Sequence, residues 1–131
     1  MGHRHFVTIN PGTLPDDGGL SFVLKPAGGY GGITVIAAYA VTGAVGTLNL
    51  VLQNYGVSGT VAGGTVAGMA SGTATVWAVD TPQALTITAA NQFIDENEWL
   101  VLKKVESAAA NDLTADAVVS IEYVDGITTV G

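Results

Sequence analysis

The sequence predicts an all-β domain: a β-sandwich of jelly-roll type with about eight strands and an extended N-terminal arm. Eighteen glycines and four prolines divide the 131 residues into short segments. These segments are rich in β-branched residues, and many alternate polar and apolar side chains with period two, which is typical of half-buried strands. This length fits one domain. We therefore predict an arm at residues 1–19 and a single β-sandwich domain at residues 20–131.

The candidate strands follow one another along the chain. We predict strands at Phe6–Ile9, Leu20–Lys25, Ile33–Val41, Thr47–Gln53, Thr73–Val79, Leu85–Thr88, Trp99–Val105 and Val118–Val124. The clearest is Thr47–Gln53, in which three leucines at alternate positions would face the core. Ile33–Val41 is almost continuously apolar, as expected when protein covers both faces of a strand. Thr73–Val79 and Leu85–Thr88 are expected to form a hairpin, because the proline between them breaks the strand.

Two segments between these strands are expected to be loops. Gly59–Gly63 (GTVAG) is repeated at once as Gly64–Gly68. Two copies are too few for a solenoid, and so much glycine favours a flexible loop or a short edge hairpin. Ser107–Asn111 has a helix-like composition, but it is so short that we expect at most one helical turn.

The charge content is low and acidic, which excludes several partners. Only 11% of the residues are charged, and four basic against eleven acidic residues give a formal net charge of −7. Such a molecule repels a phosphate backbone, so we expect no nucleic-acid partner. The absence of cysteine excludes disulfides and Cys-ligated metals. Ile33–Leu52 is long enough for a membrane span, but its polar residues and alternation favour strands, so we expect no membrane partner.

Residues 1–19 have the composition of an arm. Two histidines flank an arginine near the start, and two prolines with paired aspartates and glycines follow. No signal-peptide core is visible there. An extended arm buries little surface by itself, and its apolar side chains favour docking on another surface over disorder. The candidate docking residues are His3, Arg4, His5, Phe6, Val7 and Ile9.

The chain offers few groups for catalysis. Both histidines lie within the first five residues, so a Ser-His-Asp site would need its base on the arm. His3 and His5 have the alternate spacing of two metal ligands on a strand, but no third ligand is identifiable. Four acidic residues could supply the carboxylate pair of a glycosidase, at a separation that the sequence does not give: Asp80, Asp95, Glu98 and Glu122. We expect no enzymatic activity, no cofactor and no metal.

Two clusters have both a structural and a functional interpretation. Asp95–Glu98 could attract calcium, but it lacks the glycine-turned loop of a calcium motif, so a solvated turn is favoured. Trp77 and Trp99, together with several tyrosines, could form a sugar-stacking platform or interface hot spots. Core or subunit interface is favoured over sugar binding, because most tryptophans in small sandwiches lie in the core.

The middle of the chain suggests self-association. No Asp, Glu, Lys or Arg occurs from Pro26 to Val79, although about one residue in four is charged in ordinary proteins. A lone small sandwich would leave much of such a stretch exposed, apolar and prone to aggregate. Burial against copies of itself would remove this exposure. The candidate self-association residues are Ile33, Val35, Tyr39, Leu50 and Tyr55.

Two C-terminal segments resemble small structural proteins of tailed bacteriophages. In Phe93–Glu106 (FIDENEWLVLKKVE), an acidic turn precedes Glu-Trp and an aliphatic strand with two lysines. Ala117–Gly126 (AVVSIEYVDG) is a last strand that closes on Tyr-Val-x-Gly. The Gly/Thr/Val/Ala-rich middle of the chain is similar in style.

The resemblance implies a capsid decoration protein, also called a cement protein. Such proteins are β-sandwich or jelly-roll domains, usually trimers, that bind the outer surface of the phage head and bridge major capsid subunits. The implied partners are the major capsid protein and further copies of the chain, and the implied location is the outside of the virion. The family has no catalytic residues to assign.

The resemblance and the composition together suggest how the chain would act. The arm from His3 to Ile9 would reach onto a neighbouring capsid subunit, with Arg4 pairing with an acidic partner and Phe6 filling a pocket. The alternative is a phage fibre or tail protein, or a carbohydrate-binding jelly-roll module that uses Trp77 or Trp99 as a platform.

Overall fold

The computed structural model describes residues 4–10, 20–29, 31–41, 47–60, 63–68, 75–76, 80–106 and 118–126. These residues form ten β-strands and one short 3-10 helix, η1. The strands are β1 (Arg4–Ile9), β2 (Leu20–Leu24), β3 (Ile33–Val41), β4 (Thr47–Asn54), β5 (Thr65–Gly68), β6 (Thr75–Val76), β7 (Gln83–Ile87), β8 (Phe93–Ile94), β9 (Leu100–Glu106) and β10 (Val118–Asp125), and η1 spans Ala89–Asn91. The prediction of an all-β protein is confirmed. In this part of the chain, no helix is long and apolar enough to span a membrane.

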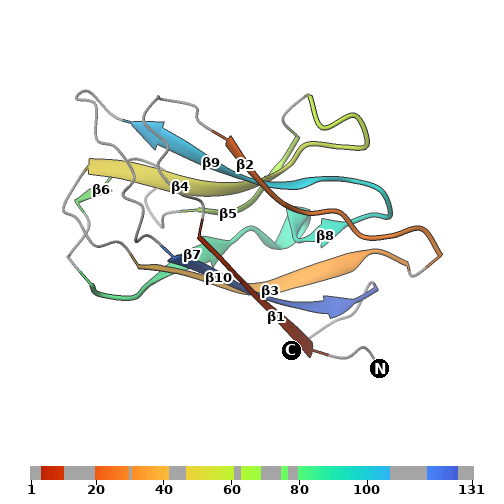
Figure 1. Ribbon diagram of the computed structural model, residues 1–131, viewed down its shortest axis with the longest axis horizontal. Helices are drawn as coiled ribbons and strands as arrows, with labels where there is room; N and C mark the ends of the chain where they lie inside the picture. The colour runs from red at the N-terminus through yellow and green to blue at the C-terminus, as the bar shows by residue number, and fades with distance from the viewer. Residues whose placement is uncertain are drawn as a thin grey trace.

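All the strand pairings are antiparallel, and they join the strands into one curved sheet. The order is β1-β10-β3-β7-β5-β4-β9-β2, with β6 beside β4 and β8 beside β3. Figure 1 shows the two halves of this sheet facing one another, with β2, β9 and β4 in one half and β1, β10 and β3 in the other. The sheet is nearly barrel-shaped, and β1 and β2 are its two ends. The finer prediction of a β-sandwich of jelly-roll type is not confirmed.

Strand β7 joins the two halves. Its first residues, Gln83–Leu85, pair with β3, and its last two, Thr86 and Ile87, pair with β5. A strand that changes partner part-way along its length forms the corner of a curved sheet. Backbone hydrogen bonds therefore run from one half into the other.

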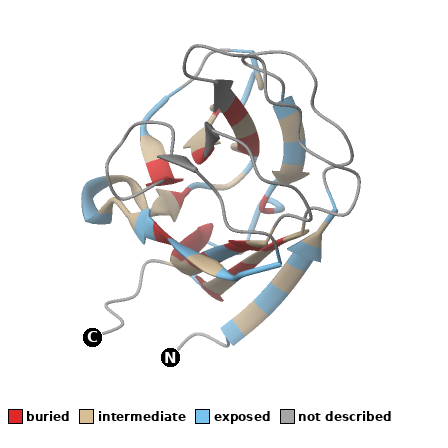
Figure 2. Cartoon of the chain, turned by 90° about the vertical axis from the view of Figure 1, so that its left-hand side faces the viewer, coloured by how far each residue is buried: buried red, intermediate tan, exposed pale blue. Residues whose placement is uncertain are grey.

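The core lies between the two halves, where Figure 2 shows most of the buried residues. Leu50 and Leu52 of β4 are fully buried, as predicted, and they pack in one cluster with Val35 of β3 and Ile121 of β10. Each fully buried side chain of this size contributes about 1.5–3 kcal/mol relative to exposure. Lys104 of β9 is also fully buried, and it takes part in an interaction there. Much of the uncharged middle of the chain is therefore this protein's own core.

Several local predictions differ from the structure. The hairpin predicted around Pro82 is wrong, because β6 pairs with β4 whereas β7 pairs with β3 and β5. The second GTVAG copy is not a loop or an edge hairpin: its residues Thr65–Gly68 form β5, which lies between β4 and β7 with Val66 and Ala67 fully buried. The short strand β8 was not predicted. The predicted turn at Ser107–Asn111 lies outside the described residues.

Candidate functional site

The residues predicted to dock on a partner lie in strand β1, at one end of the sheet. Arg4 to Ile9 pair with Val124 to Val119 of β10, so this part of the predicted arm is a strand of the protein's own sheet. Figure 2 shows it beside the N label, with exposed and half-buried residues in alternation. Predicted docking residue His3 lies outside the described part of the chain.

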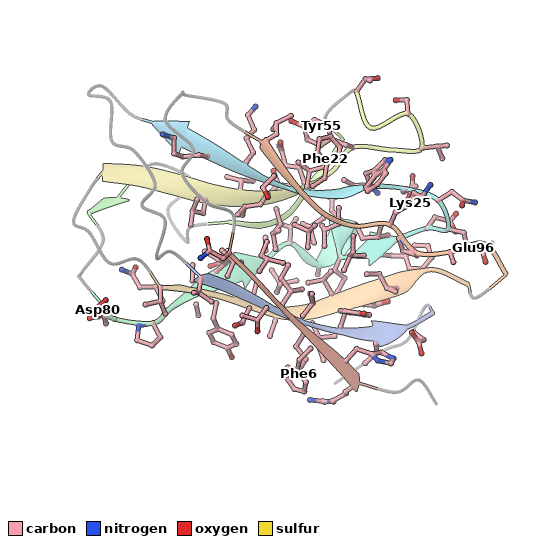
Figure 3. All side chains as sticks on the ribbon, in the orientation of Figure 1. Phe6, Phe22, Lys25, Tyr55, Asp80 and Glu96 are labelled. Atoms are coloured by element: carbon pink, nitrogen blue, oxygen red, sulfur yellow. The ribbon has the colours of Figure 1, made fainter. Side chains whose placement is uncertain are left out.

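The alternation along β1 separates the predicted docking residues into two sets. His5, Val7 and Ile9 are half-buried, and the two aliphatic residues pack against the core cluster. Arg4 and Phe6 point to the other side and are exposed. Phe6 is the most exposed large hydrophobic residue in the described part of the chain, at 72%, and Figure 3 shows its ring pointing away from the body of the molecule. Of the predicted apolar anchors, Phe6 is therefore the one free to contact another molecule.

Polar contacts fasten β1 to β10. Arg4 Nη1 donates a hydrogen bond to Glu122 Oε2 of its own chain at 2.9 Å, forming an ion pair, whereas the prediction placed the acidic partner of Arg4 on a capsid subunit. His5 Nε2 lies 3.0 Å from Asp125 Oδ2, and the His5 ring stacks on Tyr123. Arg4, His5 and Asp125 are about half exposed, whereas the Glu122 side chain is 17% exposed. Pairs near the surface are worth about 0–1 kcal/mol each. They fix the register of β1 more than they add stability.

Four of the five residues predicted for self-association are buried, and one is exposed. Ile33, Val35, Leu50 and Tyr55 are all buried within the chain, so their side chains are covered without a second copy. Tyr39 of β3 is half-exposed, at 49%. Among these five residues, only Tyr39 presents a large surface to a partner.

Tyr39 and Phe6 lie on the same outer face of the sheet. In the strand register, Tyr39 is opposite Ser120 of β10, which is opposite Thr8 of β1, two residues along from Phe6. The Thr8 and Ser120 hydroxyls are hydrogen-bonded at 3.3 Å, which confirms that these side chains share a side. We call the surface formed by Phe6, Thr8, Tyr39 and Ser120 the outer face. It carries two aromatic rings separated by small polar groups.

A second group of aromatic residues lies at the other end of the sheet. Phe22 of β2 packs edge-on against Trp99 and Tyr55, with ring centroids 5.4 and 6.3 Å apart. Lys25 Nζ lies over the Trp99 ring, 5.2 Å from its centroid, an arrangement typical of a cation–π contact. Figure 3 shows Phe22, Tyr55 and Lys25 together on one side of the molecule. The contribution of Phe22 and Lys25 was not predicted, because these residues lie far from Trp99 along the chain.

The arrangement around Trp99 favours a structural role. A β-carbon added at Gly59 would lie 2.9 Å from Trp99 Cδ1, so the turn after β4 passes directly against the indole. The backbone of Trp99 is also bonded to this turn, since its amide donates to Gly56 O and its carbonyl accepts from the Tyr55 amide. Lys25 Nζ lies over one face of this indole, and Phe22 packs edge-on against the ring. The other predicted platform residue, Trp77, lies outside the described residues.

In the acidic turn Asp95–Glu98, the carboxylates accept hydrogen bonds from backbone amides and from a side chain. Glu98 Oε1 accepts hydrogen bonds from the Asp95 amide and from Asn54 Nδ2, and Glu96 Oε2 accepts one from the Gly31 amide. These contacts match the predicted turn. In the described part of the chain, no three His, Cys, Asp or Glu residues are grouped so that they could hold a metal ion.

Comparisons with protein-family models, with curated proteins and with solved structures return no match to this chain.

Proposed function

We propose that this chain is a virion structural protein, a capsid decoration protein that binds the outside of a phage head and bridges major capsid subunits. Residues 93–106 and 117–126, which carry the resemblance to phage structural proteins, include β8, β9 and β10. β9 lies in one half of the sheet and β10 in the other. The resemblance therefore extends over both sides of the fold.

The observation that carries the proposal is the exposure of Phe6 on an end strand. A phenylalanine that is 72% exposed gains about 1.5–3 kcal/mol when a partner buries it fully. Aromatic rings of this kind are typical centres of protein interfaces. Because β1 and β10 hold Phe6 in a fixed register, the ring is presented to a partner without the cost of ordering a free arm.

The charge of the molecule fits a position outside the shell. A net charge of −7 opposes close contact with packaged DNA, which is itself negatively charged. An external protein strengthens a shell by adding contact area across the joints between subunits. An interface of standard size, about 1,200–2,000 Å², repeated over many sites, is sufficient for this and requires no chemistry.

We further propose that copies of the chain associate, as a homotrimer, through the part of the outer face around Tyr39. Tyr39 is the exposed member of the predicted self-association set. We also propose that the two halves of the sheet are arranged as a β-sandwich of jelly-roll type. The alternative of a fibre tip or a carbohydrate-binding module with Trp99 as its platform is less favoured, because Phe22, Lys25 and the turn at Gly59 all pack against the Trp99 ring.

Particle binding by two matched variants tests the proposal. In Phe6→Ser, loss of the exposed ring should weaken binding to emptied heads of the phage that encodes the chain by about 30-fold, as expected for an interface hot spot worth about 2 kcal/mol. Val57→Ser is the control, because Val57 is similarly exposed, at 67%, but lies in the turn after β4. Co-sedimentation with the heads measures both affinities.

Two outcomes would contradict the proposal. Equal binding by the two variants would remove Phe6 from the docking surface. Absence of the chain from purified virions, measured by mass spectrometry, would overturn the proposed function itself.

A further inference from the structure

We propose that β1 is an exchangeable strand: in closely spaced copies, β1 of one copy occupies the place beside β10 of another. The inference concerns contacts between two copies of this chain and does not depend on the proposed function. It rests on the position of β1 in the sheet, on the contacts that hold it there, and on the length of chain that connects it to β2.

Strand β1 can leave the sheet without disturbing any other strand pairing. It is the end of the strand order, and in the described part of the chain it pairs with β10 alone. All the polar side-chain contacts described above for β1 are also with β10: Arg4 with Glu122, His5 with Asp125, and Thr8 with Ser120. Removal of β1 therefore breaks strand pairing with β10 alone, together with the packing of Val7 and Ile9 against the core cluster.

The place beside β10 cannot stay empty without cost. Val7 and Ile9 pack against the core cluster, and His5 stacks on Tyr123. If β1 left, the half-buried Tyr123 and the edge of the core would be exposed to water, and the backbone of β10 would lose its partner along Val119–Val124. An unpaired edge of this length is a template for another strand. The strand with the correct side chains for it is β1 of a second copy.

The chain between β1 and β2 limits how far β1 can extend toward a second copy. Eleven residue steps separate Ile9 from Leu20, and a fully extended chain spans about 3.3–3.6 Å per residue, or at most about 36–40 Å here.

The two arrangements contain the same contacts between β1 and β10, so concentration decides between them. Exchange of an identical element is a common, low-cost route to association. A short flexible linker holds its strand at an effective concentration in the millimolar range. We therefore expect exchange at about 1 mM protein, or where copies are held side by side, and closed monomers in dilute solution.

Cysteine cross-linking tests the exchange, because the natural chain contains no cysteine. Thr8 Oγ1 and Ser120 Oγ lie 3.3 Å apart, so Thr8→Cys on one chain and Ser120→Cys on another can form a disulfide across exchanged strands. The two single variants, one of them isotopically labelled, are mixed at about 1 mM in a glutathione redox buffer. We expect the yield of the dimer between Thr8→Cys and Ser120→Cys chains to be several-fold higher than the yield of the dimer between Thr8→Cys and the control Val57→Cys.

A second pair excludes simple contact between two outer faces. Val7 lies opposite Ile121 on the inner side of the sheet, and Ile121 is fully buried. A mixture of Val7→Cys and Ile121→Cys chains can therefore cross-link only if β1 of one chain is seated on the other. The expected result is a mixed dimer at millimolar protein and little of it at 100-fold dilution. Formation of the outer pair alone, or yields equal to those of the Val57→Cys control, would overturn strand exchange.

Discussion

The two ends of the sheet differ in what surrounds their exposed phenylalanines. At the β2 end, Phe22 is 49% exposed, but its ring touches both Trp99 and Tyr55. At the β1 end, Phe6 is more exposed, and within the described residues its ring contacts no other aromatic ring. Exposure alone does not distinguish the two residues. The contacts of each ring indicate that Phe22 stabilises the fold, whereas Phe6 is available to a partner.

The largest expected difference between the two ends is in stability. Trp99→Ala removes the ring on which Phe22, Lys25 and the turn after β4 pack, and we expect it to lower the free energy of unfolding by about 2–3 kcal/mol. Phe6→Ala should change this free energy by no more than about 0.5 kcal/mol, as is usual for an exposed position. Urea denaturation of both variants measures the difference. Equal losses would show that Phe6 is as much a part of the folded core as Trp99.

A pair of glycines sharpens the description of the β2 end. Gly59 and Gly56 both have left-handed backbone conformations, with φ near +70° and +66°, but an added β-carbon meets Trp99 at Gly59 and meets nothing at Gly56. Both alanine variants therefore carry the conformational cost of about 1–2 kcal/mol. The free energy of unfolding should be about 1 kcal/mol lower in Gly59→Ala than in Gly56→Ala, because the indole has to shift to admit the added methyl group. If thermal and urea unfolding give the same loss of stability for both variants, the contact between the turn and Trp99 has room for a methyl group.

The smallest expected effect is at the β1 end. A double-mutant cycle on Arg4→Ala and Glu122→Ala should give a coupling energy of about 0.5 kcal/mol, because the Arg4 side chain is largely exposed. The coupling should decrease further at high salt, since exposed charges are screened. A salt-independent coupling above about 2 kcal/mol would mean that this ion pair is shielded from water.

Short apolar segments, alternating or continuous, were sufficient to find most strands. Thr47–Gln53, with its alternating leucines, corresponds closely to β4 (Thr47–Asn54), and Ile33–Val41 has the same bounds in the structure. The β5 strand was missed because its sequence, Thr-Val-Ala-Gly, contains small residues that are also common in loops. Small side chains suit this place, because β5 is buried beside the corner at β7.

Which strands pair with each other was harder to predict than where the strands lie in the sequence. Neighbouring strands in a sequence commonly pair, which favoured a hairpin around Pro82. In the structure, β6 pairs with β4 and β7 forms the corner, and such long-range contacts leave no local sequence signal. The aromatic group at the β2 end was partly missed for the same reason, because Phe22, Tyr55 and Trp99 come from three distant segments.

The uncharged middle of the chain teaches a different lesson. Where the structure describes this stretch, low charge correctly indicated that protein covers part of it, because most of its described strand residues are buried or half-buried. It did not indicate which protein, because a strand in the chain's own core and a strand in an interface between copies have the same composition. Four of the five predicted self-association residues lie in the chain's own core. Tyr39 differs from these four only in its exposure in the folded structure.

The shared strand β7 has a mechanical consequence. Two layers held together by apolar side chains alone resist separation, but they yield more easily when pushed sideways past one another. Here β7 pairs with β3 at one end and with β5 at the other, so a sideways displacement would have to break backbone hydrogen bonds. A load applied to β10 or β3 is therefore transmitted along the peptide backbone to the opposite wall of the molecule.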